Sequence, residues 1–184
     1  MNIRMIATSM VVAAAMAGAL IAPSATAAAS HGTRGSSQPA SSNVSATQRV
    51  GIDINWVKHS FVGEGADFLR VVVQQNNLRA GDGLRIYIDA RSKDPGPEFV
   101  VEGYTGSEWT LRKAETWKKF GAQVACPSSF FKMNESKDRS TLRLLWSCLS
   151  DQAHFRLAVR ANSTNGPNID WWPSFHKFGN WFSI

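Results

Sequence analysis

The chain has 184 residues, of which 43% are hydrophobic and 18% charged, and its formal net charge is +6. This length supplies a core for one domain and excludes two domains once an N-terminal leader is set aside. A basic balance can draw an exported protein towards anionic surfaces such as wall polymers, acidic lipids, polysaccharides or free nucleic acid; at this modest charge, the sequence favours the alternative that the charge only keeps the protein in solution.

The first residues have the order of an export signal. Asn2 and Arg4 make the start polar and positive, residues 5–22 are almost entirely apolar, and small residues follow Pro23. We therefore predict a signal peptide at residues 1–27, cleaved near Ala27 or Ala29, and a secreted, extracellular protein. The alternative is a retained membrane helix, since the apolar run is close to the shortest that can span a bilayer. After cleavage, no later stretch is apolar enough to be a transmembrane segment.

Residues 28–48 consist mostly of small and polar side chains. Such a segment cannot bury enough surface to offset the entropy lost on ordering, so we expect a flexible Ser/Ala-rich tether. The folded domain then occupies residues 49–184. Arg4 is the only charged residue of the leader, so its removal leaves 19 basic against 14 acidic residues and a net charge of +5.

Apolar and polar residues alternate through this domain with a period of two, the pattern of strands with one buried face. The predicted fold is all-β: a single antiparallel β-sandwich, jelly-roll-like, with about seven to nine strands and at most one short helix. Trp56 is expected to share the buried face with Ile52 and Ile54. The predicted strands cover residues 52–56, 68–73, 84–89, 99–101, 131–133, 142–146 and 154–160.

Three carboxylates follow the strand at residues 84–89: Asp89, Asp94 and Glu98. Hard oxygen ligands of this kind could hold Ca²⁺, although their spacing is not that of an EF-hand. In the structural alternative, Asp94 caps the turn at Pro95-Gly96, and Asp89 pairs with Arg91 or with an arginine on a neighbouring strand. The sequence favours the structural alternative, and no other cofactor is expected.

Residues 107–120 are ambiguous. Ser107 is a candidate N-cap, and apolar residues recur at helical spacing as far as Phe120, which predicts a short helix. The pair Trp109 and Leu111 fits a short strand equally well.

The only two cysteines, Cys126 and Cys148, lie within the domain. An even number of cysteines in an exported chain indicates a disulfide. A zinc site would require further thiols or imidazoles at ligand spacing, which the sequence lacks.

Tryptophan and phenylalanine are concentrated near the C-terminus. Trp171 and Trp172 are adjacent, so in an extended chain they point to opposite faces and one of them is a candidate for exposure, as is Trp181. Exposed indole rings stack on sugars and attract cations. In the alternative, the tail folds over the sandwich and its rings plug an open end.

The order of several motifs resembles a group of small secreted bacterial β-sandwich proteins. These motifs are DINWVKHS, LRVVVQ, LRIYIDARSKDPGPEF, LRLLWSCLS, FRLAVRA, IDWWPSF and a final NWF, within residues 50–182. More distantly, the strand pattern is similar to that of family-nine carbohydrate-binding modules and DOMON-like domains. The resemblance implies a sandwich fold and export. DOMON-like pockets take haem or sugar, but no histidine or methionine ligand can be matched here, so haem is not expected.

Five arginines are out of phase with the apolar residues of their strands and should point outward. If their strands adjoin, they form one basic stripe able to bind phosphates or carboxylates, accompanied by Tyr87 on the strand of Arg85. The alternative is an ordinary solvated face. The five are Arg70, Arg85, Arg143, Arg156 and Arg160.

No nucleophile elbow, zinc-protease motif, phosphate loop or complete dinucleotide fingerprint is present. We therefore expect a monomeric, noncatalytic binding module for a glycan or another anionic cell-envelope polymer, with no specific nucleic-acid partner. The residues expected to contact the ligand are Trp171, Trp172, Trp181, Arg85, Tyr87, Arg143, Arg156 and Arg160. Two alternatives remain: a secreted hydrolase with an unrecognised site, which predicts a deep pocket where a histidine meets a carboxylate, and an interaction or inhibitor domain, which predicts a large apolar patch.

Overall fold

A computed structural model describes residues 36–39, 52–150, 152, 154–164 and 167–183. The predicted signal peptide, its cleavage site and most of the predicted tether lie outside the described residues. Within the tether range, the structure places a short strand, Ser36–Pro39, against the strand that begins the predicted domain.

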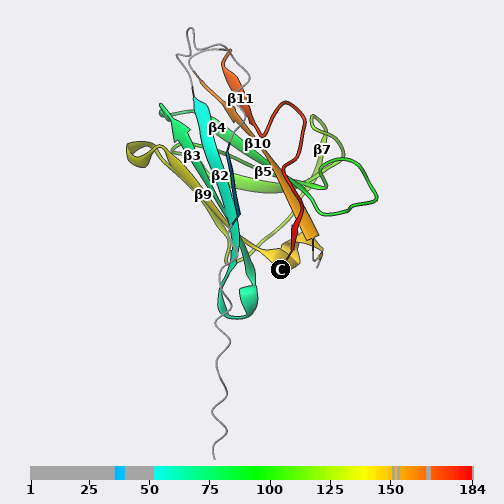
Figure 1. Cartoon of the computed structure of the whole chain (residues 1–184). Helices are drawn as coiled ribbons and strands as arrows, with labels where there is room; N and C mark the ends of the chain where they lie inside the picture. Colours follow the sequence, from blue (N-terminus) through cyan, green and yellow to red (C-terminus); the bar gives the residue numbers. More distant parts are fainter. Residues whose placement is uncertain (1–35, 40–51, 151, 153, 165–166, 184) are drawn as a thin grey trace, which may run out of the picture. The chain divides into compact units, whose positions relative to one another are not determined.

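Two antiparallel β-sheets pack face to face, which confirms the predicted sandwich (Figure 1). The first sheet has the order β1-β2-β3-β9-β8, with bounds Ser36–Pro39, Asp53–Val62, Phe68–Asn76, Arg139–Leu145 and Phe130–Asn134. The second sheet has the order β11-β10-β4-β5-β6-β7, with bounds Ile169–Trp172, His154–Asn162, Gly83–Asp89, Phe99–Tyr104, Trp109–Ala114 and Phe120–Gln123, and β12 (Phe182–Ser183) pairs with β10.

The described residues form more strands than the seven to nine expected, because β1, β7, β11 and β12 are each four residues or shorter. Strands of that length carry too few residues for alternation to reveal them. Three short 3₁₀ turns complete the regular structure: Glu64–Ala66, Glu135–Lys137 and Trp146–Leu149. No helix among the described residues is long and apolar enough to cross a membrane.

The helix considered for residues 107–120 is not formed. That segment instead contains β6, a turn, and the start of β7. Leu111 is buried between the sheets while Arg112 lies on the outer side, which is the period of a strand. Trp117, which suggested helical spacing, lies in the turn and packs against Tyr87 with ring centroids 5.0 Å apart.

The core lies between the sheets and is built from the inward residues of both. It includes Val57, Leu69, Val71, Val73, Leu142 and Leu144 from the first sheet and Leu84, Ile86, Ile88, Val101, Leu111, Leu157, Val159 and Trp172 from the second. All of these side chains are at most 2% exposed. Their burial is the main favourable contribution to folding.

One strand departs from the simple alternation. The pairing of β2 with β3 shifts between Ile54 and Trp56, which marks a β-bulge. The extra residue reverses the phase, so Val57 rather than Trp56 enters the core. Trp56 lies on the outer side beside Lys58, whose Nζ is 4.8 Å from the ring centroid. The expectation that Trp56 shares the buried face with Ile54 is therefore wrong.

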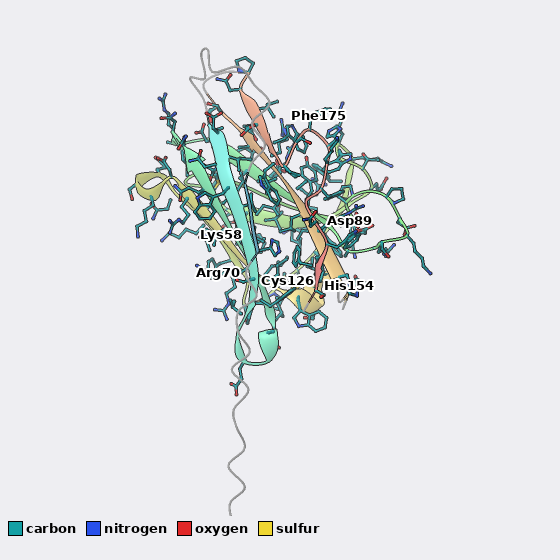
Figure 2. All side chains as sticks on the ribbon, in the orientation of Figure 1. Lys58, Arg70, Asp89, Cys126, His154 and Phe175 are labelled. Atoms are coloured by element: carbon teal, nitrogen blue, oxygen red, sulfur yellow. A yellow bond between two sulfur atoms is a disulfide. The ribbon has the colours of Figure 1, made fainter. Side chains whose placement is uncertain are left out.

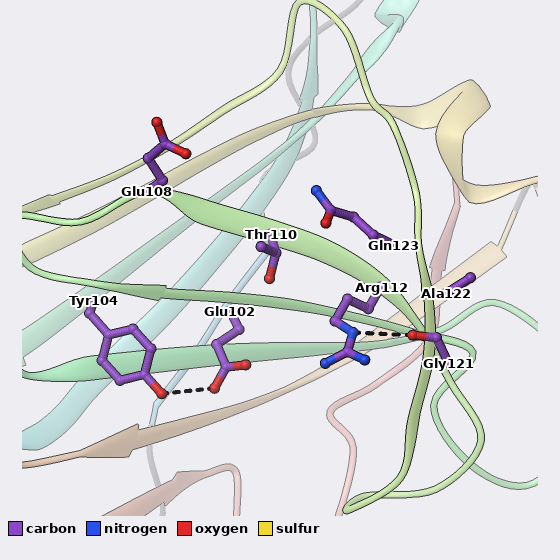
Figure 3. Close-up of a pocket in the computed structure, with 8 residues that line it drawn as sticks. All are labelled: Glu102, Tyr104, Glu108, Thr110, Arg112, Gly121, Ala122 and Gln123. Atoms are coloured by element: carbon purple, nitrogen blue, oxygen red, sulfur yellow. Dashed lines mark hydrogen bonds between the residues drawn. The ribbon is translucent and has the colours of Figure 1, made fainter.

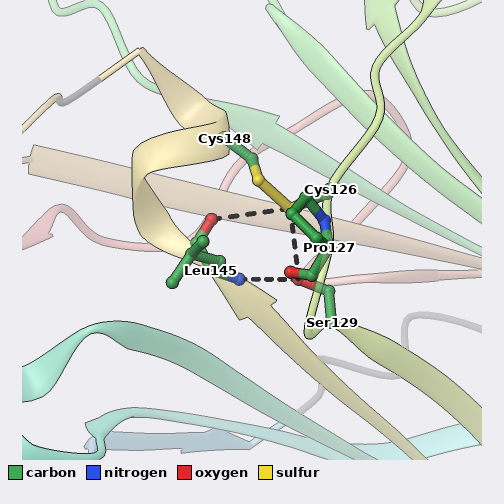
Figure 4. The surroundings of a disulfide bond; sticks show 5 residues. All are labelled: Cys126, Pro127, Ser129, Leu145 and Cys148. Carbon is green, nitrogen blue, oxygen red and sulfur yellow. Dashed lines mark hydrogen bonds between the residues drawn. A yellow bond between two sulfur atoms is a disulfide. The ribbon is translucent and has the colours of Figure 1, made fainter.

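The predicted disulfide is present and joins Cys126 to Cys148 (Figure 4). Cys126 follows β7, where the chain crosses from the second sheet to the first, and Cys148 lies in the 3₁₀ turn before the chain returns to the second sheet. Next to the bond, the backbone N–H of Leu145 donates to the Ser129 hydroxyl oxygen, with a distance of 2.9 Å. The disulfide thus ties together two connections between the layers.

A buried carboxylate organises another of these connections. Asp82, which is 0% exposed, precedes β4. Its Oδ2 accepts a hydrogen bond from the backbone N–H of Arg79 at 2.8 Å, and its Oδ1 accepts one from the N–H of Thr164 at 3.0 Å. Because its hydrogen bonds compensate its burial, this side chain can fix the β3–β4 and β10–β11 loops side by side.

Replacing both cysteines by serine should lower the free energy of unfolding by about 3 kcal/mol, because the bond closes a loop across a sequence separation of 22 residues. Urea denaturation of both proteins measures the difference. A reducing agent should destabilise the parent protein and leave the Cys126→Ser/Cys148→Ser variant unchanged; equal midpoints for parent and variant would contradict the expectation.

Candidate functional site

The outer side of the second sheet gathers most of the predicted ligand-contacting residues. In β4, Leu84, Ile86 and Ile88 point into the core, so Arg85 and Tyr87 point outward. We call this surface the second-sheet face. Five side chains on neighbouring strands lie in register across it, forming one row: Trp171, Arg160, Arg85, Glu102 and Thr110.

A hydrogen-bonded group occupies the middle of this row. Arg85 Nε donates to Glu102 Oε1 at 2.6 Å, and the Tyr104 hydroxyl donates to the same oxygen at 3.0 Å. Although burial opposes its charge, the hydrogen bond and the charge of Glu102 raise the pKa of Arg85. Burial, together with Glu102, also raises the pKa of Tyr104, which therefore stays protonated as a hydrogen-bond donor.

Two open hollows flank Tyr104 on this face. The larger, about 490 Å³, is lined by Glu102, Tyr104, Glu108, Thr110, Arg112, Gly121, Ala122 and Gln123 (Figure 3). The smaller, about 330 Å³, is lined by Arg85, Tyr104, Arg160, Asn162, Ser163, Pro167, Asn168 and Ile169. The Tyr104 side chain lines both hollows and is 40% exposed.

The local sequence explains where this ring lies. Gly83 starts β4 opposite Tyr104 in the β4–β5 register. A Cβ atom at Gly83 would come within 2.7 Å of the Tyr104 ring, so the ring occupies space that only a glycine leaves free. On the other side of the larger hollow, Arg112 Nε donates to the Gly121 carbonyl at 3.1 Å and fixes β7 as its wall.

An aromatic cluster covers the part of the face next to this row. Tyr87, Trp117, Trp171, Phe175 and Phe178 belong to it. The rings of Tyr87 and Trp171 stack with centroids 5.6 Å apart, and the Tyr87 hydroxyl donates to the Trp117 carbonyl at 3.1 Å. Tyr87 is only 1% exposed, and burial raises its pKa, so it supports the cluster from beneath. Phe175 is 66% exposed and is labelled in Figure 2.

The two adjacent tryptophans point to opposite sides, as the extended chain requires. Trp171 belongs to the aromatic cluster on the second-sheet face, whereas Trp172 is 2% exposed and belongs to the core. Trp172 is therefore placed where it cannot meet a ligand. Trp181 is 38% exposed, and its ring centroid lies 4.7 Å from the guanidinium carbon of Arg156.

The five arginines do not form one stripe. Arg85, Arg156 and Arg160 lie on the second-sheet face, whereas Arg70 and Arg143 pair with each other across β3 and β9 in the first sheet. The strands that carry the two sets belong to different layers, so the condition for a single stripe, that all these strands adjoin, is not met.

The three candidate calcium ligands serve other contacts. Asp89 is fully buried, and its Oδ2 accepts a hydrogen bond from Arg156 Nε at 2.6 Å, which is the cross-strand pairing considered as the alternative to metal binding. Glu98 accepts from the backbone N–H of Ala90 at 2.7 Å, while exposed Asp94 pairs with Arg91. No group of three or more His, Cys, Asp or Glu side chains among the described residues is arranged to hold a metal ion.

The three histidines of the domain have different surroundings. His59 is 8% exposed and stacks on Phe182 with centroids 3.7 Å apart, whereas His154 is exposed at the start of β10. His176 stacks on Trp117 in the aromatic cluster. Burial lowers the pKa of His176, and the positive charges of Lys118 and Arg160 lower it further. Neither hollow has a histidine in its lining.

Tyr104 and its neighbours Glu102, Glu108, Arg112 and Gln123 were not identified from the sequence. A usable signal existed, because Val100, Glu102 and Tyr104 alternate with the inward residues Phe99 and Val101. The pattern predicts that they point outward. The same pattern does not predict that β5 lies near the centre of the second-sheet face.

Comparisons of the chain with models of protein families, with curated proteins and with solved structures found no match.

Burial lowers the pKa of His59 from 6.5 to about 4, so the folded protein takes up the proton only at lower pH than the unfolded chain does. Between pH 6.5 and pH 4 the unfolded state binds more protons, and stability should fall by up to about 3 kcal/mol as the pH drops through this window.

Denaturation midpoints measured from pH 7 to pH 4 test this expectation. His59→Phe should flatten the pH dependence in that window, and the exposed control His154→Gln should leave it as in the parent. A His59→Phe variant with the parent's slope would show that this histidine does not cause it.

Proposed function

We propose that this protein is a noncatalytic binding module that takes a glycan on its second-sheet face. The observation that carries the proposal is the exposed ring of Tyr104 between two open hollows. Aromatic rings present an apolar face with a polar edge, which suits the apolar faces of sugar rings. Because Tyr104 borders both hollows, consecutive units of one chain can lie on either side of it.

The lining of the hollows supports a hydroxyl-rich ligand. It offers carboxylate, guanidinium, amide and hydroxyl groups from Glu108, Arg112, Gln123, Asn162 and Asn168, which can donate and accept hydrogen bonds around a sugar. The hydrogen bond of Arg85 with Glu102, and that of Tyr104 with the same oxygen, hold the side chains in place before a ligand arrives.

The charges on this face favour a neutral or weakly charged glycan over a polyanion. Arg85 is paired with Glu102 and Arg156 with Asp89, so two of the cations are already neutralised. Glu108 adds a further negative charge beside the larger hollow. With the export signal predicted from the sequence, the proposed ligand is an extracellular glycan.

The hydrolase alternative is less well supported. It requires a deep pocket in which a histidine meets a carboxylate, whereas both hollows are open and lined without histidine. The interaction-domain alternative requires a large contiguous apolar patch. Of the exposed large apolar side chains among the described residues, Phe130 lies on β8 of the first sheet, and Tyr104, Ile169, Phe175 and Trp181 lie on the side of the second sheet, where Arg85, Arg156 and Arg160 lie among them.

Tyr104→Ala should weaken retention on the bound glycan by about tenfold, because one stacking contact is lost together with the hydroxyl that orders Glu102. Binding to neutral polysaccharides and to peptidoglycan, measured in 0.5 M salt to screen charge, provides the test. Phe130→Ala is the matched control, since Phe130 is 44% exposed on the other layer. No retention of the parent protein on any of these glycans, at high or low salt, would remove the proposal.

Gly83→Ala should also reduce glycan binding while leaving the fold intact. The added Cβ atom would come within 2.7 Å of the Tyr104 ring, and this partly exposed ring can rotate away. Circular dichroism and a denaturation midpoint check the fold, and the same retention assay checks the ring position. Unchanged retention for Gly83→Ala, with reduced retention for Tyr104→Ala, would contradict the role of the glycine in placing the ring.

A further inference from the structure

The outer side of the first sheet carries a second surface, which is rich in cations. Three rows of its outward residues run across β2, β3, β9 and β8: Ser60, Arg70, Arg143 and Phe130; Lys58, Val72, Thr141 and Lys132; and Trp56, Gln74, Arg139 and Asn134. Phe68 lies on the same side beyond the first row, and the pair Asp53 and Asn76 lies beyond the third. We call this surface the first-sheet face. These rows contain five cations and no carboxylate. Figure 2 labels Lys58 and Arg70, which belong to the first sheet, and Phe175, which lies on the second-sheet face.

Among the described residues, none of the ion pairs includes any of these five cations. The pairs formed are Arg85 with Glu102, Arg91 with Asp94, Lys119 with Glu115 and Arg156 with Asp89. The second-sheet face therefore neutralises two of its arginines internally, whereas the positive charge of the first-sheet face is left for an external anion.

Arg70 and Arg143 repel each other, and a bound anion would reduce this repulsion. Arg70 and Arg143 are direct cross-strand partners, and like charges in this position repel each other. The guanidinium carbon of Arg143 lies 3.9 Å from the centroid of the Phe68 ring. Its Nε is buried without a hydrogen-bond partner in the described part of the chain. An anion that bridges both side chains would relieve the repulsion between them.

The cations follow a path across the sheet. Lys58, Arg70, Arg143 and Lys132 lie on the four successive strands β2, β3, β9 and β8. Neighbouring strands are about 5 Å apart, and outward residues recur along a strand about every 7 Å, so the path suits a linear chain with closely repeated negative charges. Guanidinium groups bind phosphate and carboxylate oxygens alike in pairs, and a phosphodiester chain supplies such charges at repeated positions on a flexible backbone that can follow this path.

The aromatic rings of this face argue against a nucleic acid. Single-stranded nucleic acids bind by stacking their bases on free ring faces. Here Lys58 and Arg139 lie 4.8 and 6.0 Å from the centroid of the Trp56 ring, and Arg143 lies against Phe68, so cations occupy these two rings. The third ring, Phe130, is 44% exposed on the edge strand β8 and offers one isolated stacking surface rather than a run of them.

From this charge complementarity we infer that the first-sheet face binds a linear polyol-phosphate polymer, a chain of phosphodiesters without bases. This inference does not rest on the proposed glycan site, because the two surfaces belong to different layers and share no residue. The protein would then hold a phosphate polymer on one face while the other face remains open to a neutral glycan.

Binding of the full chain to synthetic poly(glycerol phosphate), measured at 50 and 200 mM salt, tests the inference. Arg70→Gln/Arg143→Gln should weaken binding at least about tenfold at 50 mM salt and reduce its salt dependence. Because this double variant removes a repulsive pair, it should fold. Lys58→Gln/Lys132→Gln, which keeps the two arginines, should also weaken binding.

The matched control is Arg79→Gln/Lys93→Gln, which removes the same charge from exposed loop positions and should change binding less than about twofold. Tyr104→Ala should leave this binding unchanged, so that failure of the glycan proposal and failure of this one are distinguishable. Equal loss in the control and in Arg70→Gln/Arg143→Gln would overturn the inference, as would no binding to the probe. Tighter binding to oligo(dT), to polygalacturonate or to phosphatidylglycerol vesicles would also overturn it.

Discussion

The ion pair between Asp89 and Arg156 joins β4 to β10 beneath the second-sheet face. Asp89 is fully buried at the end of β4, and its partner lies directly opposite on β10. A buried carboxylate that loses its partner costs about 3–5 kcal/mol, so this pair fixes the register of β4 against β10. The guanidinium carbon of Arg156 lies 4.9 Å from the Phe178 ring centroid and 4.7 Å from that of Trp181, and it thereby holds the C-terminal segment against the second sheet.

The two outer faces differ because of what covers them. The second-sheet face is partly roofed by Phe178 and Trp171 from the C-terminal segment and by Trp117 from the β6–β7 turn, and its arginines are paired with carboxylates. What stays accessible is a mixed polar and aromatic strip around Tyr104. No comparable aromatic layer among the described residues lies over the cations of the first-sheet face. One sandwich thus presents two surfaces that differ in charge and in aromatic content.

Sequence reasoning was most accurate where a single strand carries the information. Alternation along residues 84–89 and 154–160 identified which residues face the core and which face outward, including Arg85 and Arg156. It did not identify that the outward residues Tyr87 and Asp89 are buried as well. It was wrong where a local irregularity changes the phase, as at the bulge before Trp56, and where a turn mimics helical spacing, as at Trp117. The candidate site was identified only in part: Arg85, Arg160 and Trp171 were expected, whereas Tyr104 and Glu102 were not.

The sequence by itself determined the all-β class, the pairing of its only two cysteines and the side of each strand on which most residues lie, because period-two burial and cysteine count are local or compositional properties. The tertiary structure decided which strands are neighbours. That choice places Arg70 and Arg143 in one layer and Arg85, Arg156 and Arg160 in the other, and it brings Tyr104 over Gly83. Strand order depends on contacts between residues far apart in the chain, which no single strand's pattern encodes.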